Sequence, residues 1–253
     1  MAKKELQQDT TSAPRSSNPV PFVLPLVIFL LIASWYPDFA SEEDPEAMLA
    51  ATHWFVGMIA VQVVLATSLL IYFRKIYLQH FVFRISPLSV VVGVIGVVIW
   101  IGICSLRIEP RVLGLLGFDF NLGFDFNRPS FDPYTLPDLG FRTTFLFFRI
   151  LLLAVIVPLI EELFLRGWFV RWVEDPEWEN LSLRGLSWKA LMAASVYGVL
   201  THPTEAIAAF VWFGLVSWLM NRTGSLWDCV VAHAVTNLLL GVYVLIFAQW
   251  HLW

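Results

Sequence analysis

The chain has 253 residues, of which 58% are hydrophobic and only 14% are charged, and it contains 21 Phe and 12 Trp. One soluble domain cannot bury so much apolar surface, so the composition excludes a soluble globular protein. The formal net charge is −4, and no basic field favours nucleic acid as a partner. Cys104 and Cys229 lie in apolar runs without metal-like or disulfide-like spacing, and we interpret both as buried small apolar residues.

The N-terminal segment divides into a polar part and an apolar part. Residues 1–18 are polar and show no apolar periodicity, which predicts a disordered tail. The apolar stretch 20–36 is long and has no small-residue cleavage pattern, so it is interpreted as a spanning helix and not as a cleaved signal peptide. Residues 19–253 are then predicted to form one polytopic membrane domain.

Apolar stretches recur along the rest of the chain, and together they predict an all-α, polytopic bundle of about seven transmembrane helices. The longest are sufficient to cross roughly 30 Å of hydrocarbon at about 1.5 Å per residue. Two of the expected crossings are short. The predicted spans are 20–36, 47–73, 86–106, 143–172, 189–202, 206–220 and 226–247.

The basic residues favour a cytoplasmic N-terminus, because cytoplasmic loops carry an excess of Lys and Arg. On this topology eleven basic residues fall on the cytoplasmic side: Lys3, Lys4, Arg15, Arg74, Lys75, Arg84, Arg166, Arg171, Arg184, Lys189 and Arg222. Four fall on the opposite side, all in one loop: Arg107, Arg111, Arg128 and Arg142.

That loop, 107–142, contains a short internal duplication. Gly117–Asn121 recurs as Gly123–Asn127, with Phe alternating with Asp. The alternation predicts a strand-like or interfacial segment on the outer leaflet, and a substrate gate is a less favoured alternative to a duplication without function. Its aspartates lack the spacing of a calcium loop.

Ionisable residues concentrate in the later spans, and this asymmetry is the main indication of function. Charged groups in hydrocarbon persist mainly where they face a protein-lined or water-filled cavity. Glu162 and Arg166 are four residues apart, in the order that favours an ion pair. Glu161 then points about 100° away, toward a different neighbour, and is left as a usable base. Pro158 leaves a backbone carbonyl of this helix without its usual partner and could bend it.

A second group of polar residues lies on the following helices. His233 and Asn237 share a helix face, as donors to a developing oxyanion must. His202 ends a short span directly before Pro203, and a broken helix end at membrane depth must be buried in protein or line a cavity. Each of these features could instead serve only helix packing. Together they favour a water-activating hydrolase.

Two motifs resemble those of a known family. Residues 161–166, EELFLR, resemble the EExxxR motif of the CAAX protease and bacteriocin-processing family of intramembrane endopeptidases. Residues 233–237, HAVTN, resemble the HxxxN motif of the same family. His202 falls where that family has an intervening histidine. The resemblance covers mainly residues 143–247. The C-terminal sequence from Thr223, with the WIGI and GFD segments, is most similar to the CAAX-protease-related proteins of bacterial exosortase and PEP-CTERM systems.

The resemblance implies an all-helical membrane core whose cavity opens toward the cytoplasm. It also implies a bacterial inner membrane location, a membrane-anchored protein or peptide as substrate, and exosortase-system proteins as partners. The implied reaction is hydrolysis of a peptide bond by glutamate-activated water. By motif, the resemblance implies that Glu161 is the base and acts with His202. It implies that His233 and Asn237 donate to the oxyanion, and that Glu162 and Arg166 form a supporting pair.

One departure from the family pattern concerns the residue four positions before the middle histidine. The family usually has an aromatic there, whereas this chain has Gly198, with the aromatic Tyr197 one position earlier. An aromatic displaced by about 100° cannot fill the same wall, so the departure bears on the role of His202.

Other interpretations stay open at the level of sequence. A catalytically silent scaffold or chaperone that binds C-terminal membrane segments would keep the same polar cavity. Proton-coupled transport would also use intramembrane Glu and His, but no inverted repeat links the two halves of the chain. The sequence does not identify a cofactor. Whether the site holds a metal stays open, because two histidines and a glutamate could form a zinc triad, but the chain has no HExxH helix and the sequence leans toward a site without metal.

Overall fold

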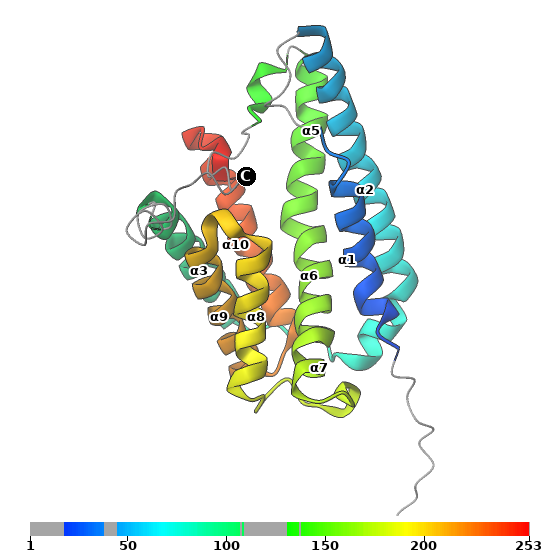
Figure 1. The fold of residues 1–253 in the computed structure, drawn as a ribbon, viewed down its shortest axis with the longest axis vertical. Helices are drawn as coiled ribbons and strands as arrows, with labels where there is room; N and C mark the ends of the chain where they lie inside the picture. The colour runs from blue at the N-terminus through cyan, green and yellow to red at the C-terminus, as the bar shows by residue number, and fades with distance from the viewer. Residues whose placement is uncertain (1–17, 38–44, 107, 109–130, 137, 253) are drawn as a thin grey trace, which may run out of the picture.

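The protein is an all-α bundle in the computed structural model, which describes residues 18–37, 45–106, 108, 131–136 and 138–252. The helices form two neighbouring groups (Figure 1). The first contains α1 (Val20–Ala33), α2 (Pro45–His80) and one long helix built from α5 (Leu139–Leu151), α6 (Val157–Phe164) and α7 (Val170–Glu174). The second contains α3 (Pro87–Leu106), α8 (Trp188–Thr201), α9 (Ala206–Thr223) and α10 (Leu226–Phe247).

Seven helical segments occupy the positions predicted for the seven crossings. Five of them, within the described residues, are long and apolar enough to cross a membrane: Glu46–His80, Pro87–Leu106, Leu139–Glu174, Pro203–Thr223 and Leu226–Phe247. The first segment, α1, and the α8 helix have 14 residues each. The outward surfaces of the bundle are rich in exposed aliphatic side chains, as lipid contact requires.

The long helix is interrupted twice by π-helical turns, η3 (Leu152–Ile156) and η4 (Leu165–Phe169). The first directly precedes Pro158, which has no N–H to donate. In the π turn the N–H of Val157 bonds the carbonyl of Leu152, five residues back. In the same register the partner of Leu153 would be Pro158, so the carbonyl of Leu153 must find another donor. The sequence predicted a carbonyl without its usual helix partner near Pro158 and a possible bend there; the structure has a π turn at this place.

Glycines let α3 approach α10 and α9 closely. A Cβ at Gly93 would lie 2.7 Å from the carbonyl oxygen of Ala232, and one at Gly96 would lie 2.8 Å from Nε1 of Trp212. The Thr236 hydroxyl bonds the carbonyl oxygen of Gly93 at 3.0 Å across this contact. Small residues thus allow backbone-level contact between membrane helices.

The end of the bundle that carries α7 is fastened by polar contacts between turns. Asp228, fully buried in the first turn of α10, accepts hydrogen bonds from the backbone N–H and the hydroxyl of Ser86. The guanidinium groups of Arg84 and Arg184 both donate to the carbonyl of Thr223, just before Gly224 takes a left-handed conformation with φ +65°. These bonds hold the α2–α3 and α9–α10 turns together.

Two expectations fall outside the described residues: the disordered tail, apart from Asn18, and the duplicated segment Gly117–Asn127. The expectation of two buried cysteines is correct for Cys229, which is fully buried, and wrong for Cys104, which is only partly buried. Cys104 lies two residues before the end of α3.

Candidate active site

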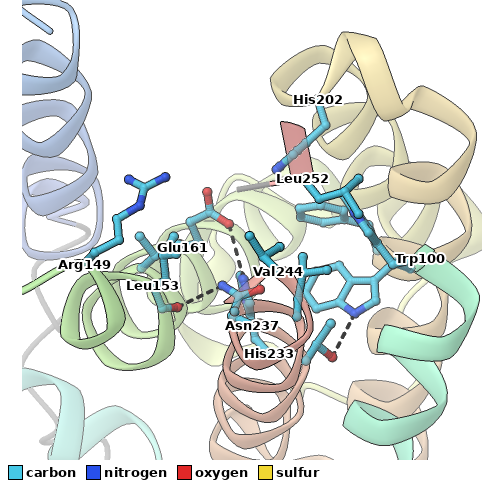
Figure 2. Close-up of a pocket in the computed structure, with 15 residues that line it drawn as sticks. Trp100, Arg149, Leu153, Glu161, His202, His233, Asn237, Val244 and Leu252 are labelled. Carbon is cyan, nitrogen blue, oxygen red and sulfur yellow. Dashed lines mark hydrogen bonds and ion pairs between the residues drawn. The ribbon is translucent and has the colours of Figure 1, made fainter. Parts of the chain in front are cut away.

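A cavity of about 240 Å³ lies between the two helix groups. Figure 2 shows side chains from the long helix, α3, α8 and α10 converging on it. Four of the residues singled out in the sequence line it: Glu161, His202, His233 and Asn237. The remaining lining residues are Trp100, Arg149, Leu153, Val157, Trp212, Phe213, Thr236, Leu240, Gly241, Val244 and Leu252.

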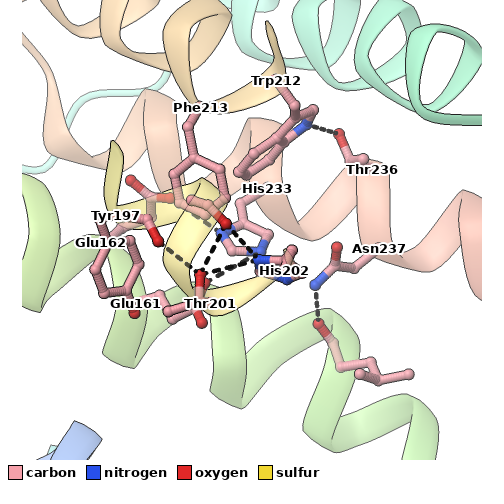
Figure 3. A network of polar contacts seen from close by, with 12 residues as sticks. Glu161, Glu162, Tyr197, Thr201, His202, Trp212, Phe213, His233, Thr236 and Asn237 are labelled. Carbon is pink, nitrogen blue, oxygen red and sulfur yellow. Dashed lines mark hydrogen bonds and ion pairs between the residues drawn. The ribbon is translucent and has the colours of Figure 1, made fainter. Parts of the chain in front are cut away.

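A buried chain of charged and polar groups lies beside the cavity, and Figure 3 shows two of its members, Glu162 and His233. Nη1 of Arg166 donates to Oε2 of Glu162 at 2.5 Å, and both side chains are fully buried. The other nitrogen, Nη2, donates to the carbonyl of Phe213 at 3.0 Å. The second carboxylate oxygen of Glu162 lies 3.0 Å from Nδ1 of His233. The predicted pair between Glu162 and Arg166 is present, and it continues into the imidazole.

These contacts determine the arrangement of protons on His233. A carboxylate paired with a guanidinium can only accept hydrogen bonds, so Nδ1 of His233 carries a hydrogen. Nε2 is then the nitrogen that faces the cavity, and it lies 3.9 Å from Oε2 of Glu161. That distance exceeds a direct hydrogen bond. It leaves the two groups facing each other across a short gap.

Glu161 and Glu162 were expected to point toward different neighbours, and in the structure both approach His233. The imidazole lies between them, with one ring nitrogen toward each carboxylate. A ring can satisfy two side chains about 100° apart on a helix because its own two nitrogens diverge. The environments of the two acids still differ: the Glu161 side chain is 13% exposed, whereas that of Glu162 is fully buried.

Asn237 lies four residues beyond His233 on α10 and also reaches the cavity. Its Nδ2 donates to the carbonyl of Leu153 at 2.9 Å, the carbonyl that Pro158 leaves without a helical partner. One amide hydrogen of Asn237 is thus used to attach α10 to the π turn. An NH₂ group has two hydrogens, so one donor is not used by that bond.

His202 lies at the junction of α8 with η6 (Pro203–Glu205), where the chain turns back into α9. Its Nδ1 is 2.9 Å from the hydroxyl of Thr201 and 3.2 Å from the carbonyl of Gly198. Since a carbonyl only accepts, Nδ1 donates to the carbonyl of Gly198. Estimated from the sequence, His202 lay about 21 Å from the interface, deeper than the other candidates. The broken helix end nevertheless brings it to the same cavity.

Aromatic side chains form the wall between the two histidines, and the sequence reasoning did not identify them. The ring of Trp212 meets that of His233 edge-on at 4.6 Å, and Trp100 meets His202 in the same way at 5.5 Å. The ring of Phe213 lies 5.9 Å from that of His202. The sequence shows that aromatic residues are adjacent in α9. Residue type alone does not distinguish them from the aromatic residues of this chain that face lipid.

Gly198 is pressed against one of these rings. A Cβ at this position would lie 2.3 Å from Cδ2 of Phe213. The space in which an aromatic at position 198 would begin is therefore occupied by Phe213, which comes from the next helix. The departure from the family pattern at Gly198 is matched by an aromatic supplied from α9.

Within the described residues, no group of three or more His, Cys, Asp or Glu side chains is arranged to hold a metal ion. The donors nearest each other already have defined partners, since Nδ1 of His233 bonds Glu162 and Nδ1 of His202 bonds neighbours within its own helix end.

The comparisons with known proteins bear on the second half of the chain. No curated protein matches the chain, and no solved structure does. Residues 143–239, which include all six candidate side chains, match the family model described as type II CAAX prenyl endopeptidase Rce1-like. Over this segment the chain is similar to the Rce1-like CAAX endopeptidases, and the match supports the resemblance to the CAAX protease and bacteriocin-processing family.

Proposed function

We propose that this protein is an intramembrane endopeptidase that hydrolyses a peptide bond of a membrane-associated protein with water activated by Glu161. The observation that carries the proposal is the position of the Glu161 carboxylate, which faces Nε2 of His233 across 3.9 Å at the wall of the cavity. A water in this gap would contact both the carboxylate and the imidazole, and the carboxylate can take its proton. The match to the Rce1-like family supports the same reaction class.

In the proposed reaction the water oxygen attacks the peptide carbonyl carbon, and one water proton passes to Glu161. The carbonyl oxygen becomes an oxyanion, which needs donors already oriented toward it. The second amide hydrogen of Asn237 and the Nε2 hydrogen of doubly protonated His233 are the donors that this cavity offers. The C–N bond then breaks, the proton on Glu161 passes to the leaving nitrogen, and an acid and an amine are released.

Glu162 and Arg166 support this chemistry without facing the substrate. The Glu162 carboxylate accepts a hydrogen bond from Nδ1 of His233, so it fixes the ring plane and directs Nε2 toward the cavity. Arg166 neutralises Glu162 and attaches the helix to α9 through the carbonyl of Phe213. We propose His202 as a third polar group of the cavity wall.

The test is to purify the Glu161→Gln variant from membranes and to identify intact polypeptides that co-purify with it. The amide keeps the shape of the side chain but cannot accept the proton, so we expect a folded protein that retains substrate and cleaves it about 10²–10⁴-fold more slowly than wild type. Glu177→Gln, at an exposed position beyond α7, is the matched control and should cleave normally. Equal cleavage by both variants would contradict the proposal.

The main competing function is a scaffold or chaperone that binds C-terminal membrane segments in the same cavity without cleaving them. A scaffold should tolerate Glu161→Gln completely, and wild-type protein should release every co-purified polypeptide intact. Either result would favour the scaffold over the endopeptidase.

The cellular setting is part of the proposal. We propose a bacterial inner membrane protein with a cytoplasmic N-terminus that acts in exosortase and PEP-CTERM sorting. The similarity of the C-terminal sequence to exosortase-associated relatives supports the sorting role, and the distribution of basic residues supports the orientation. Recovery of proteins with such C-terminal sorting segments on Glu161→Gln, and their cleavage by wild type, tests it.

A further inference from the structure

We propose that an apolar groove on the outside of the bundle, between α2, the long helix and the start of α10, binds one phospholipid with an anionic headgroup. In this lipid groove the phosphate lies at Arg74, and one acyl chain follows the groove to the outer side of η3. The site is distinct from the catalytic cavity, and the proposal goes beyond the proposed function.

The lipid groove has a volume of about 310 Å³. Residues of α2 from Thr67 to Leu78, spaced three or four positions apart, form one wall, since such a spacing places them on one face of the helix. The long helix supplies another wall from Val155 to Leu163, and Trp227 contributes from the first turn of α10. The groove therefore lies where the two helix groups meet.

The lining of the lipid groove suits a hydrocarbon chain. Aliphatic side chains form most of it, and two of them, Ile71 and Leu78, expose more than half of their surface at 54% and 55%. The hydroxyl of Tyr77 and Nε1 of Trp227 are polar atoms of lining residues, and both donate to backbone carbonyl groups of other segments. A hydrocarbon chain needs no hydrogen-bond partner, so it can cover this surface without leaving a polar group unsatisfied.

Arg74 is the one charged side chain among the described residues that line the groove. It is exposed, and its Nη1 donates to the carbonyl of Ile71 at 2.7 Å. A guanidinium has five N–H donors in a planar fork, and that bond uses one of them. The fork matches phosphate oxygens, which it can bind with two parallel hydrogen bonds. A lipid phosphate is thus the group that complements this end of the groove.

The length of the lipid groove fits one acyl chain. Arg and Trp side chains are typical of the membrane interface, and Arg74 and Trp227 together mark the headgroup level. From Arg74 to Thr67 the groove rises about 10 Å along α2, and from Leu163 to Val155 it covers about 12 Å of the long helix. One leaflet contributes about 15 Å of hydrocarbon, so most of one chain can lie in the groove.

The inner end of the lipid groove lies against the π turn that also borders the catalytic cavity. Val155 and Ile156 of η3 line the groove, whereas Leu153 of the same turn and Val157 directly after it line the cavity. The bound chain therefore contacts one side of this turn while the cavity occupies another. It also joins α2, the long helix and α10, so binding should stabilise the folded protein.

The test measures lipid binding to the delipidated, full-length protein in a neutral detergent, by native mass spectrometry and by thermal melts. Phosphatidylglycerol and phosphatidylcholine with identical acyl chains are the two probes, and they differ in headgroup charge. We expect one phosphatidylglycerol per chain, bound at least about fivefold more tightly than phosphatidylcholine, as one basic side chain near an anionic lipid allows. Phosphatidylglycerol should also give the larger rise in Tm.

Two pairs of neighbouring variants locate the site. Arg74→Gln should lower the affinity for phosphatidylglycerol about fivefold and leave that for phosphatidylcholine unchanged. Lys75→Gln removes the same charge from an exposed residue outside the groove lining and should change neither affinity. Ile71→Trp fills the groove with a large ring and should displace both lipids. Tyr72→Trp is its control, because Tyr72 is 76% exposed and outside the lining.

Equal phosphatidylglycerol affinities of Arg74→Gln and Lys75→Gln would overturn the headgroup site, and so would equal affinities of the wild type for the two lipids. Lipid retained by Ile71→Trp as by Tyr72→Trp would overturn the assignment of the groove. Loss of substrate capture when Ile71→Trp is added to Glu161→Gln, with lipid binding unchanged, would identify a substrate membrane segment as the occupant instead. Lipid binding is measured without hydrolysis, so its failure is distinguishable from failure of the proposed function.

Discussion

His233 and Glu162 are 71 positions apart in the sequence and lie on different helices, and Nδ1 of His233 is 3.0 Å from Oε1 of Glu162. This bond couples the cavity-facing imidazole to a fully buried ion pair. The imidazole is therefore held in one orientation by groups that never contact the cavity.

Glu162→Gln should destabilise the protein more than Glu161→Gln. Glutamine offers one oxygen to two donors, Arg166 and His233, and it leaves the guanidinium as an uncompensated buried charge. Loss of one partner of a buried pair costs about 3–5 kcal/mol. Thermal unfolding in detergent should show a clear fall in Tm, with the exposed Glu177→Gln variant unchanged. Wild-type Tm and cleavage in Glu162→Gln would contradict the supporting role.

Asn237 variants test the amide between α10 and the π turn. Asn237→Ala removes both donors and should lower turnover by about 10²–10³-fold while substrate affinity changes little. Asn237→Asp should be at least as damaging, because its carboxylate would face the carbonyl of Leu153 and the developing oxyanion. Single-turnover cleavage of the substrate trapped on Glu161→Gln gives the rate. Near-normal turnover in Asn237→Asp would mean that this residue only packs.

The close contact of α3 with α10 makes a paired glycine test possible on one helix. Gly93→Ala places a Cβ 2.7 Å from the carbonyl oxygen of Ala232, so α3 must move outward, at a cost of about 1–3 kcal/mol. Gly102→Ala meets no atom within 4 Å and should be neutral or stabilise by about 0.5–1 kcal/mol. Thermal melts of the two variants should shift in opposite directions or differ by several degrees. Equal shifts would show that the helices can separate freely.

The contact between Gly198 and Phe213 predicts that an aromatic can be moved from one helix to the other. Gly198→Phe alone should unfold or inactivate the protein, because its Cβ would lie 2.3 Å from the Phe213 ring. Gly198→Phe combined with Phe213→Gly removes that clash and should recover most of the lost Tm, together with the wall beside His202. The non-additivity is read from a double-mutant cycle of Tm and cleavage. Additive losses would show that the two positions do not share one space.

The sequence predicted the helices well because long apolar runs in a membrane protein admit few other structures. It also predicted the Glu162–Arg166 pair, since a spacing of four residues fixes both side chains on one face. Contacts between helices were harder. No local sequence pattern indicates that both glutamates lie next to His233. Nor does one indicate that the carbonyl of Leu153 accepts a hydrogen bond from Asn237. These contacts depend on how helices distant in sequence pack.

The aromatic wall was missed for a related reason. Trp212 and Phe213 belong to a chain with aromatics on every surface, so residue type alone does not separate cavity from lipid. Asp228 was a stronger signal that went unused. An acid in the first turn of an apolar helix is a candidate for a polar contact at the helix N-terminus, and here it anchors Ser86 of the α2–α3 turn.

The π turn before Pro158 has a consequence for chain length. Arg149 and Glu161 are twelve residues apart, and on a regular α-helix such a separation leaves two side chains about 120° apart. One extra residue in a π turn reduces the difference to about 20°, so both side chains reach the same cavity. Deleting one residue between them would remove the bulge and leave the two residues eleven apart on a regular α-helix, so both side chains would stay on the same wall. Relatives that lack the proline should therefore be one residue shorter here, and an alignment that omits this gap would pair the wrong glutamates.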